Sequence, residues 1–260
     1  MEEKLTSTAS NADVDVHVHD DNDNKIVSDE SRENKAVDAD SKATNDTNAD
    51  SKSTNDDSKP LSKEKSEKSS VFVKIGLIGD ASVGKTTLMV KYIENKFDEV
   101  YIETLGVNFM EKMVTLKSTD ITFSLWDLGG RQEFLTMLPL VCIDAVAFFF
   151  IFDLSRKSTL LNIKEWYRQA KGLNKNAHVI LIGNKYDLFT TLPTEEQDEI
   201  TALSKKYAKA MKASLIFSSS PYSINVQKIF KIALAKIFDL KCTLVEIDKV
   251  GEPILLFDCK

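Results

Sequence analysis

The amino-acid sequence predicts an α/β fold, with a six-stranded, mostly parallel sheet that carries helices on both faces. From Val71 onward, short apolar runs typical of buried strands alternate with longer helix-like stretches. The first apolar run leads directly into a glycine-containing loop and then into a helix. The roughly 170 residues from this point to residue 240 are enough to bury one hydrophobic core.

The expected strands are short and largely apolar: Val71–Ile78, Val107–Leu116, Ile121–Trp126, Asp144–Phe152, Ala177–Ile182 and Ser214–Phe217. The expected helices lie between or after them: Lys85–Asn95, Ser158–Lys171, Thr194–Met211 and Ser223–Phe238. Ligands of such sheets bind beyond the carboxyl ends of the strands. The loop after the first strand therefore lies at the expected ligand-binding edge.

This loop has the spacing G-x-x-x-x-G-K-[ST] of a phosphate-binding loop. With the residue that follows, it comprises Gly79, Asp80, Ala81, Ser82, Val83, Gly84, Lys85, Thr86 and Thr87. Its backbone N–H groups and the start of the next helix would attract phosphate oxygens. Lys85 would place a positive charge at the terminal phosphates, and Thr86 would offer a hydroxyl to Mg²⁺. An ordinary strand–turn–helix corner is the alternative, and spacing and context both disfavour it.

Composition divides the chain into an acidic low-complexity tail (1–69), a folded domain (70–240) and a C-terminal tail (241–260). The first 70 residues carry 18 acidic and 10 basic side chains, whereas the whole chain has a net charge of −6. Few large apolar residues lie in the N-terminal tail, so burial cannot offset the entropy of ordering it and we expect disorder. A tandem repeat at 39–46 and 49–56 favours simple low complexity over a phosphoregulated or partner-binding tail.

Several classes of protein are disfavoured by composition. The cysteines Cys142, Cys242 and Cys259 are scattered and odd in number, which suits a reducing cytoplasm and no disulfide framework. The polar N-terminus is no secretory signal. The longest apolar run, Ala145–Phe152, is far shorter than the roughly 20 residues of a membrane helix. Without a strong basic patch, we expect no nucleic-acid partner.

A second motif, Asn184-Lys185-Tyr186-Asp187, follows a predicted strand and has the N-K-x-D pattern. A carboxylate can accept hydrogen bonds from both the ring N–H and the exocyclic amine of guanine, a pair of donors that adenine does not offer. The alternative is a polar exit from a strand. Combined with the phosphate loop, the motif indicates a guanine nucleotide.

With these motifs in this order, the chain resembles the Ras-like small GTPases from about Phe72 to Leu240. The resemblance implies the P-loop small GTPase fold, binding of GTP or GDP with Mg²⁺, and hydrolysis of GTP. It also implies that Asp187 binds guanine, that Asn184 braces the site and that the stem of Lys185 packs along the base.

A D-x-x-G element runs from Asp127 to Gly130. By resemblance, Asp127 would hold Mg²⁺ through water, and the Gly130 N–H would contact the γ-phosphate. Thr104 has the family spacing of the threonine that closes over Mg²⁺ and the γ-phosphate. Phe97 corresponds to the aromatic residue that packs on guanine, and Tyr101 to the tyrosine that covers the phosphates.

The last family element is an S-A-K-like loop whose backbone N–H groups support guanine. Ser219 and Ser220 stand at its first two positions, and Pro221 replaces the usual lysine. This departure bears on nucleotide affinity rather than on the identity of the base.

The chain departs from the family at two positions that concern hydrolysis. Arg131 stands where Ras-like proteins commonly have the glutamine that orients the attacking water, and Gln132 follows it. A guanidinium cannot accept a hydrogen bond from water. Ala81 adds a methyl group where Ras has glycine and where an arginine finger arrives. Either Gln132 substitutes after a local shift, or intrinsic hydrolysis is very slow. We expect hydrolysis to be slow unless a GTPase-activating protein supplies groups such as an arginine and a glutamine.

The printed C-terminus, Phe257-Asp-Cys-Lys260, has no C-a-a-X box, so we expect no lipid anchor. Residues 241–260 are expected to pack back on the domain, with a partner-docking peptide as the alternative. This feature, with Trp126–Gly130, Phe150–Leu154 and Gly251–Leu255, most resembles the fungal septum-promoting and mitotic-exit GTPases. That branch implies a spindle pole body scaffold, a two-part GTPase-activating complex, a possible exchange factor and a protein kinase effector.

Three other functions stay open at this point. A Rab-type vesicle-trafficking GTPase would share the nucleotide motifs, but the C-terminus argues against it. A GTP-bound scaffold without useful hydrolysis is suggested by Arg131. A phosphotransferase acting on a small substrate would explain the phosphate loop alone, but not the N-K-x-D motif.

Overall fold

A computed structural model describes residues 69–100, 102–116 and 118–257. The predicted acidic tail lies outside the described residues except for its last residue, Ser69, where the first strand begins. The repeat at 39–46 and 49–56, Tyr101 and Cys259 are also outside them.

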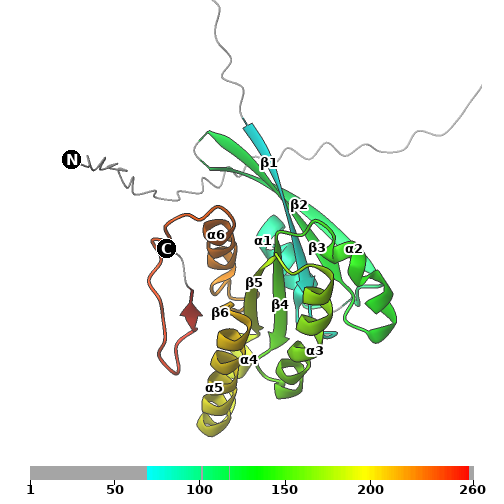
Figure 1. Cartoon of the computed structure of the whole chain (residues 1–260). Helices are drawn as coiled ribbons and strands as arrows, with labels where there is room; N and C mark the ends of the chain where they lie inside the picture. The colour runs from blue at the N-terminus through cyan, green and yellow to red at the C-terminus, as the bar shows by residue number, and fades with distance from the viewer. Residues whose placement is uncertain (1–68, 101, 117, 258–260) are drawn as a thin grey trace, which may run out of the picture. The chain divides into compact units, whose positions relative to one another are not determined.

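The described residues form a seven-stranded sheet with the order β2-β3-β1-β4-β5-β6-β7 (Figure 1). The five central strands are parallel: β3 (Thr119–Leu128), β1 (Ser69–Ile78), β4 (Ala147–Asp153), β5 (His178–Asn184) and β6 (Ser214–Phe217). Antiparallel strands flank them at both edges: β2 (Val107–Leu116) and β7 (Leu255–Leu256). The mostly parallel fold is confirmed.

The strands β4, β5 and β6 are almost entirely buried because helices cover both faces of this part of the sheet. All seven residues of β4 are buried. Phe148, Phe150 and Phe152 enter one core cluster, whereas Phe149 and Ile151 enter the other. This alternation follows from the two-residue period of a strand, so one short run supplies both layers of the core.

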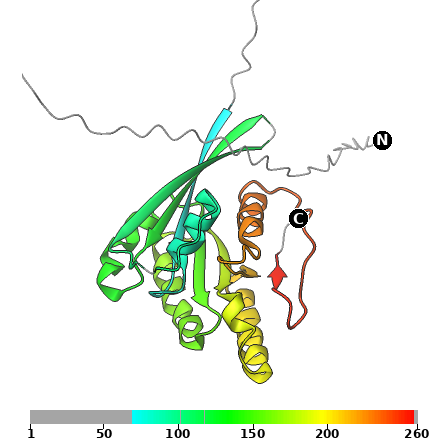
Figure 2. The same cartoon turned by 180° about the vertical axis from the view of Figure 1, so that it is seen from behind.

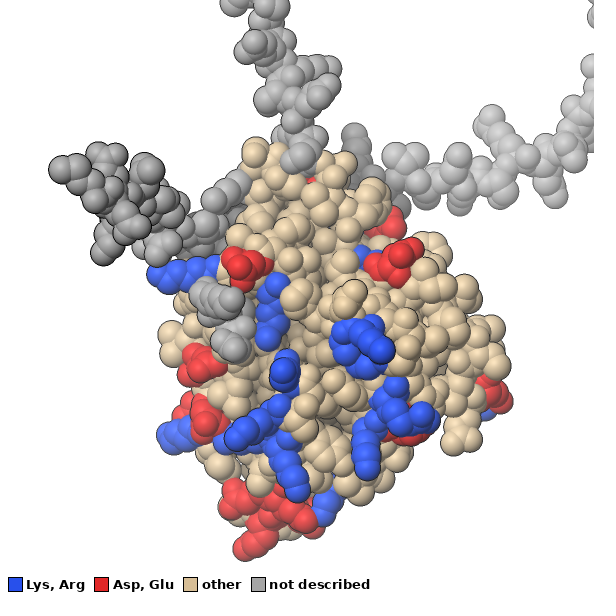
Figure 3. All heavy atoms as spheres, viewed as in Figure 1, with Lys and Arg blue, Asp and Glu red and all other residues tan. Residues whose placement is uncertain are grey.

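Helices of the two layers lie on opposite faces of the sheet (Figure 2). On one face pack α1 (Lys85–Glu94) and α6 (Val226–Ile237). The other face carries α2 (Leu138–Cys142), α3 (Lys157–Leu173) and α5 (Thr194–Met211). On the molecular face drawn in Figure 3, basic side chains lie in several separate groups among acidic and uncharged ones. Within the described part of the chain, no helix combines the length and the apolar character that crossing a membrane requires.

Three details of the predicted fold were wrong. The sheet has a seventh strand, because the C-terminal segment pairs with β6 through Leu255 and Leu256. The helix predicted from Ser223 begins at Val226, since Ser223 and Asn225 adopt left-handed backbone angles that end a tight turn. Three short helices were not expected: η1 (Gln132–Met137), α2 and α4 (Tyr186–Phe189).

Candidate functional site

A cavity of about 640 Å³ opens beyond the carboxyl ends of β1, β5 and β6. The predicted phosphate loop, the loop before β2 and the two predicted guanine loops all line it. The lining includes Ala81, Ser82, Gly84, Lys85, Thr86, Thr87, Phe97, Thr104, Gly130, Asn184, Lys185, Asp187, Ser220 and Pro221. Parallel topology therefore brings together residues that lie more than one hundred positions apart in the sequence.

The phosphate loop is shaped by two glycines that no other residue could replace without movement. Gly79 has φ 153°, and a Cβ there would lie 2.1 Å from the carbonyl oxygen of Ile151. Gly84 has φ 91°, and its Cβ would lie 2.3 Å from Nδ2 of Asn184. The loop is thus packed against β4 and against the end of β5, which fixes its position in the cavity.

Lys85 begins α1 and is almost fully buried. Its Nζ donates to the carbonyl oxygens of Gly79 at 3.0 Å and Asp80 at 2.7 Å. Burial lowers the pKa of Lys85, and the nearby carboxylates of Asp127 and Asp80 oppose that shift. The ammonium of Lys85 is therefore held in place by hydrogen bonds to the phosphate loop.

Thr86, Thr104 and Asp127 come from three different segments and meet at one point. The hydroxyl of Thr86 donates to Oδ2 of Asp127 at 2.5 Å and lies 2.7 Å from the hydroxyl of Thr104. Thr104 Oγ1 also donates to Oδ2 of Asp127 at 3.2 Å. Asp127 is fully buried, and its Oδ1 has no hydrogen-bond partner among the described residues.

These three oxygen-bearing side chains fit Mg²⁺, which prefers oxygen ligands and is bound by one or two carboxylates together with substrate phosphates. Among the described residues, no group of three or more histidine, cysteine, aspartate or glutamate side chains could hold a metal by itself. Burial raises the pKa of Asp127 above its ordinary value, and Lys85 and the two threonine hydroxyls offset only part of that rise. The unpartnered Oδ1 is the atom that a bound cation or its water would satisfy.

Of the two glycines after Asp127, Gly130 packs directly against the phosphate loop. A Cβ on Gly130 would lie 2.2 Å from the backbone nitrogen of Ala81. The N–H of Gly129 donates to the carbonyl of Gly106 at 2.7 Å, which joins this segment to the loop that carries Thr104. Any movement of one loop therefore affects the other.

Arg131, at the position where the family commonly has glutamine, points to the neighbouring loop. Its guanidinium donates to Glu103 and forms an ion pair with it, and a second carboxylate, Glu133, lies 3.9 Å away. Gln132 is exposed at the start of η1. Glu103 immediately precedes Thr104, so Arg131 bridges the two loops at the mouth of the cavity.

The side of the cavity that is expected to bind guanine is built from the ends of β5 and β6. Asn184 is buried and its Nδ2 donates to the carbonyls of Val83 at 3.1 Å and Gly84 at 3.3 Å. It therefore braces the phosphate loop rather than facing open solvent. The hydroxyl of Ser219 donates to Oδ1 of Asp187 at 2.5 Å, which orients this carboxylate.

Comparison with known proteins places this geometry in a family. The Ras family pattern matches residues 74–239, more than half of the chain. This chain belongs to the Ras family. It is 64% identical over 190 residues to septum-promoting GTP-binding protein 1 of Schizosaccharomyces pombe, an alignment that covers 73% of this chain and 96% of that protein. The protein is a small GTPase that binds GTP and GDP with Mg²⁺ and hydrolyses GTP.

More distant relatives are Ras-related proteins. SEC4 of Saccharomyces cerevisiae is 34% identical over 170 residues, covering 65% of this chain and 76% of that protein. Rab-27B of Rattus norvegicus is 33% identical over 147 residues, covering 52% of this chain and 67% of that protein.

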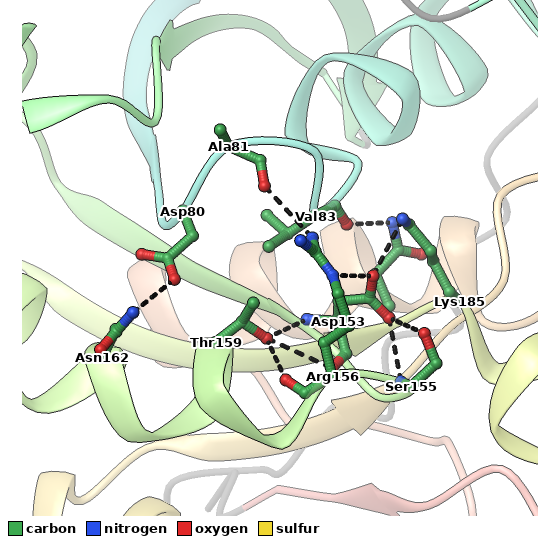
Figure 4. Close-up of polar contacts among 10 residues, drawn as sticks. Asp80, Ala81, Val83, Asp153, Ser155, Arg156, Thr159, Asn162 and Lys185 are labelled. Atoms are coloured by element: carbon green, nitrogen blue, oxygen red, sulfur yellow. Dashed lines mark hydrogen bonds and ion pairs between the residues drawn. The ribbon is translucent and has the colours of Figure 1, made fainter. Parts of the chain in front are cut away.

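One residue beside the site that sequence reasoning missed is Asp153, at the end of β4 (Figure 4). Asp153 is buried, and it forms an ion pair with Lys185 at 2.9 Å and accepts a hydrogen bond from Arg156 Nε at 2.8 Å. Both the N–H and the hydroxyl of Ser155 donate to it. Burial would raise the pKa of Asp153, but hydrogen bonds from Ser155, Lys185 and Arg156 outweigh burial and lower it.

Arg156 extends this network to the phosphate loop, since its Nη2 donates to the carbonyl of Ala81 at 3.2 Å (Figure 4). The neighbouring carboxylate of Asp80 is held by two residues of α3. Asn162 Nδ2 and Trp166 Nε1 each donate to it at 2.7 Å. A carboxylate at the end of a buried strand was the available signal, but nothing in the sequence showed that Asp153 would reach Lys185.

The remaining predicted site residues fall into three groups. Phe97 lines the cavity and is 41% exposed. Ser219 and Ser220 are buried beside Asp187, but the N–H of Ser219 donates to the carbonyl of Ile224 within its own loop. Ser219 therefore contacts Asp187 through its hydroxyl and not through its backbone. Tyr101 lies outside the described residues.

Proposed function

We propose that this protein is a guanine-nucleotide switch that controls septation and mitotic exit by signalling to a protein kinase cascade. The observation that carries this proposal is the 64% identity across 96% of a septum-promoting GTP-binding protein. Residues 70–240 would form the switch, preceded by the acidic tail. Its location would be cytoplasmic and at the spindle pole body, on a protein scaffold.

In this proposal, Lys85 neutralises charge that develops on the terminal phosphates during hydrolysis. Thr86 and Asp127 hold Mg²⁺, and Thr104 closes over the same position, which the 2.7 Å contact between the two threonine hydroxyls supports. The bound Mg²⁺ supplies electrostatic stabilisation of the phosphates. Backbone N–H groups of the phosphate loop complete the cradle, with the N–H of Gly130 on the γ-phosphate.

On the other side of the cavity, Asp187 accepts hydrogen bonds from the guanine ring N–H and amine. Lys185 packs its stem along the base while its ammonium remains paired with Asp153. Asn184 ties the phosphate loop to this half of the site. The loops 97–104 and 130–140 then order when the γ-phosphate is present and relax after its loss, which is the difference that partners would recognise.

We further propose that intrinsic hydrolysis is slow, because Arg131 pairs with Glu103 and offers no acceptor to the attacking water. A two-part GTPase-activating complex would supply the missing groups, and an exchange factor would reload GTP. Single-turnover hydrolysis of GTP by Arg131→Gln should be roughly tenfold faster or more than that of the wild type, within the usual range for a positioned catalytic group. Fast hydrolysis by the wild type that is unaffected by Gln132→Ala would contradict the proposal.

The cellular role is tested by complementation in Schizosaccharomyces pombe cells depleted of the septum-promoting relative. Expression of this chain should restore septation, whereas Thr86→Ala at equal protein level should not. A Rab-type trafficking role is the alternative, and it is favoured by the identities of 34% to SEC4 and 33% to Rab-27B. Rescue of the growth of Saccharomyces cerevisiae cells depleted of SEC4, without rescue of septation, would replace the proposal by that alternative.

A further inference from the structure

The segment 241–257, which we call the C-terminal strap, packs across the edge of the sheet beside β6 (Figures 1 and 2). Leu255 and Leu256 pair antiparallel with Ile216 and Leu215 of β6. Ile254 is buried in one core cluster and Leu255 in the other. The strap is therefore integrated into both layers of the domain.

Within the strap, residues 247–255 form a hairpin with its turn at residues 249–252. Ile247 and Leu255 exchange two backbone hydrogen bonds of 2.9 Å. The turn is closed by the N–H of Glu252 donating to the carbonyl of Lys249 at 3.1 Å. Asp248 forms an ion pair with Lys205 of α5, which fixes the hairpin against the domain.

The hairpin turn touches the guanine motif directly. The phenolic hydroxyl of Tyr186 donates to the carbonyl of Gly251 at 2.9 Å. Tyr186 lies between Lys185 and Asp187, is only 6% exposed, and its N–H donates to the carbonyl of Ser218 at 2.9 Å. One side chain thus connects the strap to the residues at the guanine side of the cavity.

A second connection runs through the end of β6, which leads into the loop 218–220. The N–H of Phe217 donates to the carbonyl of Ile254 at 2.8 Å. The buried side chain of Asn225 donates to the carbonyls of both Phe217 at 2.9 Å and Pro253 at 3.4 Å. Three strap residues, Gly251, Pro253 and Ile254, therefore hold the two loops expected to bind guanine, 184–187 and 218–220.

We infer that the C-terminal strap is a positioning element of the guanine site, that it slows nucleotide release, and that Tyr186 is the residue through which it acts. This inference rests on the proposed role of Asp187. Loosening the strap frees Tyr186 and the loop 218–220, so the base is released more readily, whereas the phosphate loop, Lys85 and Thr86 keep their places. The strap should control the lifetime of the nucleotide without changing the hydrolytic step.

The test measures release of a fluorescent GDP analogue from full-length protein in the presence of Mg²⁺. Tyr186→Phe removes only the hydroxyl and should accelerate release about fivefold, the usual effect of one lost buried hydrogen bond. Ile254→Ala, which opens a cavity under the strap, should accelerate release at least as much. Tyr167→Phe on α3, whose ring packs on Phe150 instead, should release at the wild-type rate.

Two readouts separate a positioning role from general destabilisation. In Ile254→Ala, single-turnover hydrolysis of prebound GTP should stay within about twofold of the wild type. Hydrogen exchange should increase in 184–189 and 214–220 but not in α1. If wild type and Tyr186→Phe release GDP at equal rates, the strap inference is wrong. If the wild type binds no guanine nucleotide, the proposed function fails instead.

Discussion

At the scale of single residues, the proposed function assigns the choice of base to the carboxylate of Asp187. It lines the cavity, and Ser219 donates to one of its oxygens. An amide at this position would present one acceptor and one donor, whereas guanine offers two donors. Asp187→Asn should therefore weaken GDP binding roughly 100-fold or more and improve binding of xanthosine diphosphate, which carries a carbonyl in place of the amine.

Titration of both labelled nucleotides measures this change. Asp198→Asn, on the exposed side of α5, is the matched control and should bind GDP like the wild type. Equal GDP affinity in Asp187→Asn and wild type would contradict the assignment of this residue.

His178 makes a pH-dependent contribution to folding stability. Of the chain's three histidines, it is the one within the described residues. His178 is exposed at the start of β5, but partial desolvation of its ring, together with the nearby Lys236 and Lys171, lowers the pKa of His178 from its ordinary value of 6.5. The unfolded chain then binds this proton at a higher pH than the folded chain does. The contribution is fully present above about pH 6.5 and is lost as the pH falls below it.

His178→Gln should therefore make stability less dependent on pH between about 6.5 and 5.5 while leaving it unchanged at pH 8. Urea unfolding at matched pH values measures the difference. Parallel stability curves for the two proteins would show that His178 contributes nothing to it.

At the scale of elements, the sequence predicted the helices that show several turns of apolar periodicity and the strands that appear as distinct apolar runs. The bounds of β2, β6 and α5 agree with the prediction to the residue. The short helices after Arg131 and after Lys185 were missed, because too few residues lie in them to show a period. The contacts of Asp153 were missed for another reason, since they join β4, α3 and β5 across the sheet.

The Asp153 network gives a prediction at this scale. Asp153→Asn keeps the shape of the side chain but removes the negative charge that Lys185 and Arg156 share. Folding stability should fall by about 1.5–3 kcal/mol, as expected for hydrogen bonds to a charged group, and GDP release should accelerate. Chemical denaturation and nucleotide release measure the two effects. A variant with reduced stability but unchanged release would show that the network supports the fold and not the site.

At the scale of the whole molecule, the sheet of a P-loop GTPase was predictable, and its seventh strand was not. Leu255 and Leu256 form a strand of two residues whose partner, β6, is also short. Such a pair has no local signal, because the backbone of residues forty positions away supplies its hydrogen bonds. The same limit applies to Thr86, Thr104 and Asp127. Motif spacing implied that these three residues lie close together, but their hydrogen bonds are visible only in the structure.

The nucleotide and Mg²⁺ should bind cooperatively across this site. Chelation of Mg²⁺ by EDTA should accelerate GDP release on the order of tenfold or more, within the usual range of coupling between two ligands. Thr86→Ala removes a hydroxyl from the proposed metal site and should lose most of this response. Thr191→Ala, in an exposed turn after α4, should respond to EDTA like the wild type. An equal response to EDTA in all three proteins would show that Thr86 is not part of the metal site.

The central claim is that the phosphate loop and the N-K-x-D motif form one guanine-nucleotide site. The most direct test is to identify and count the nucleotide bound to the purified full-length protein. The account predicts close to one GDP or GTP per chain, displaced by added GDP but not by ATP. Bound ATP, or no affinity for guanine nucleotides in the presence of Mg²⁺, would contradict it.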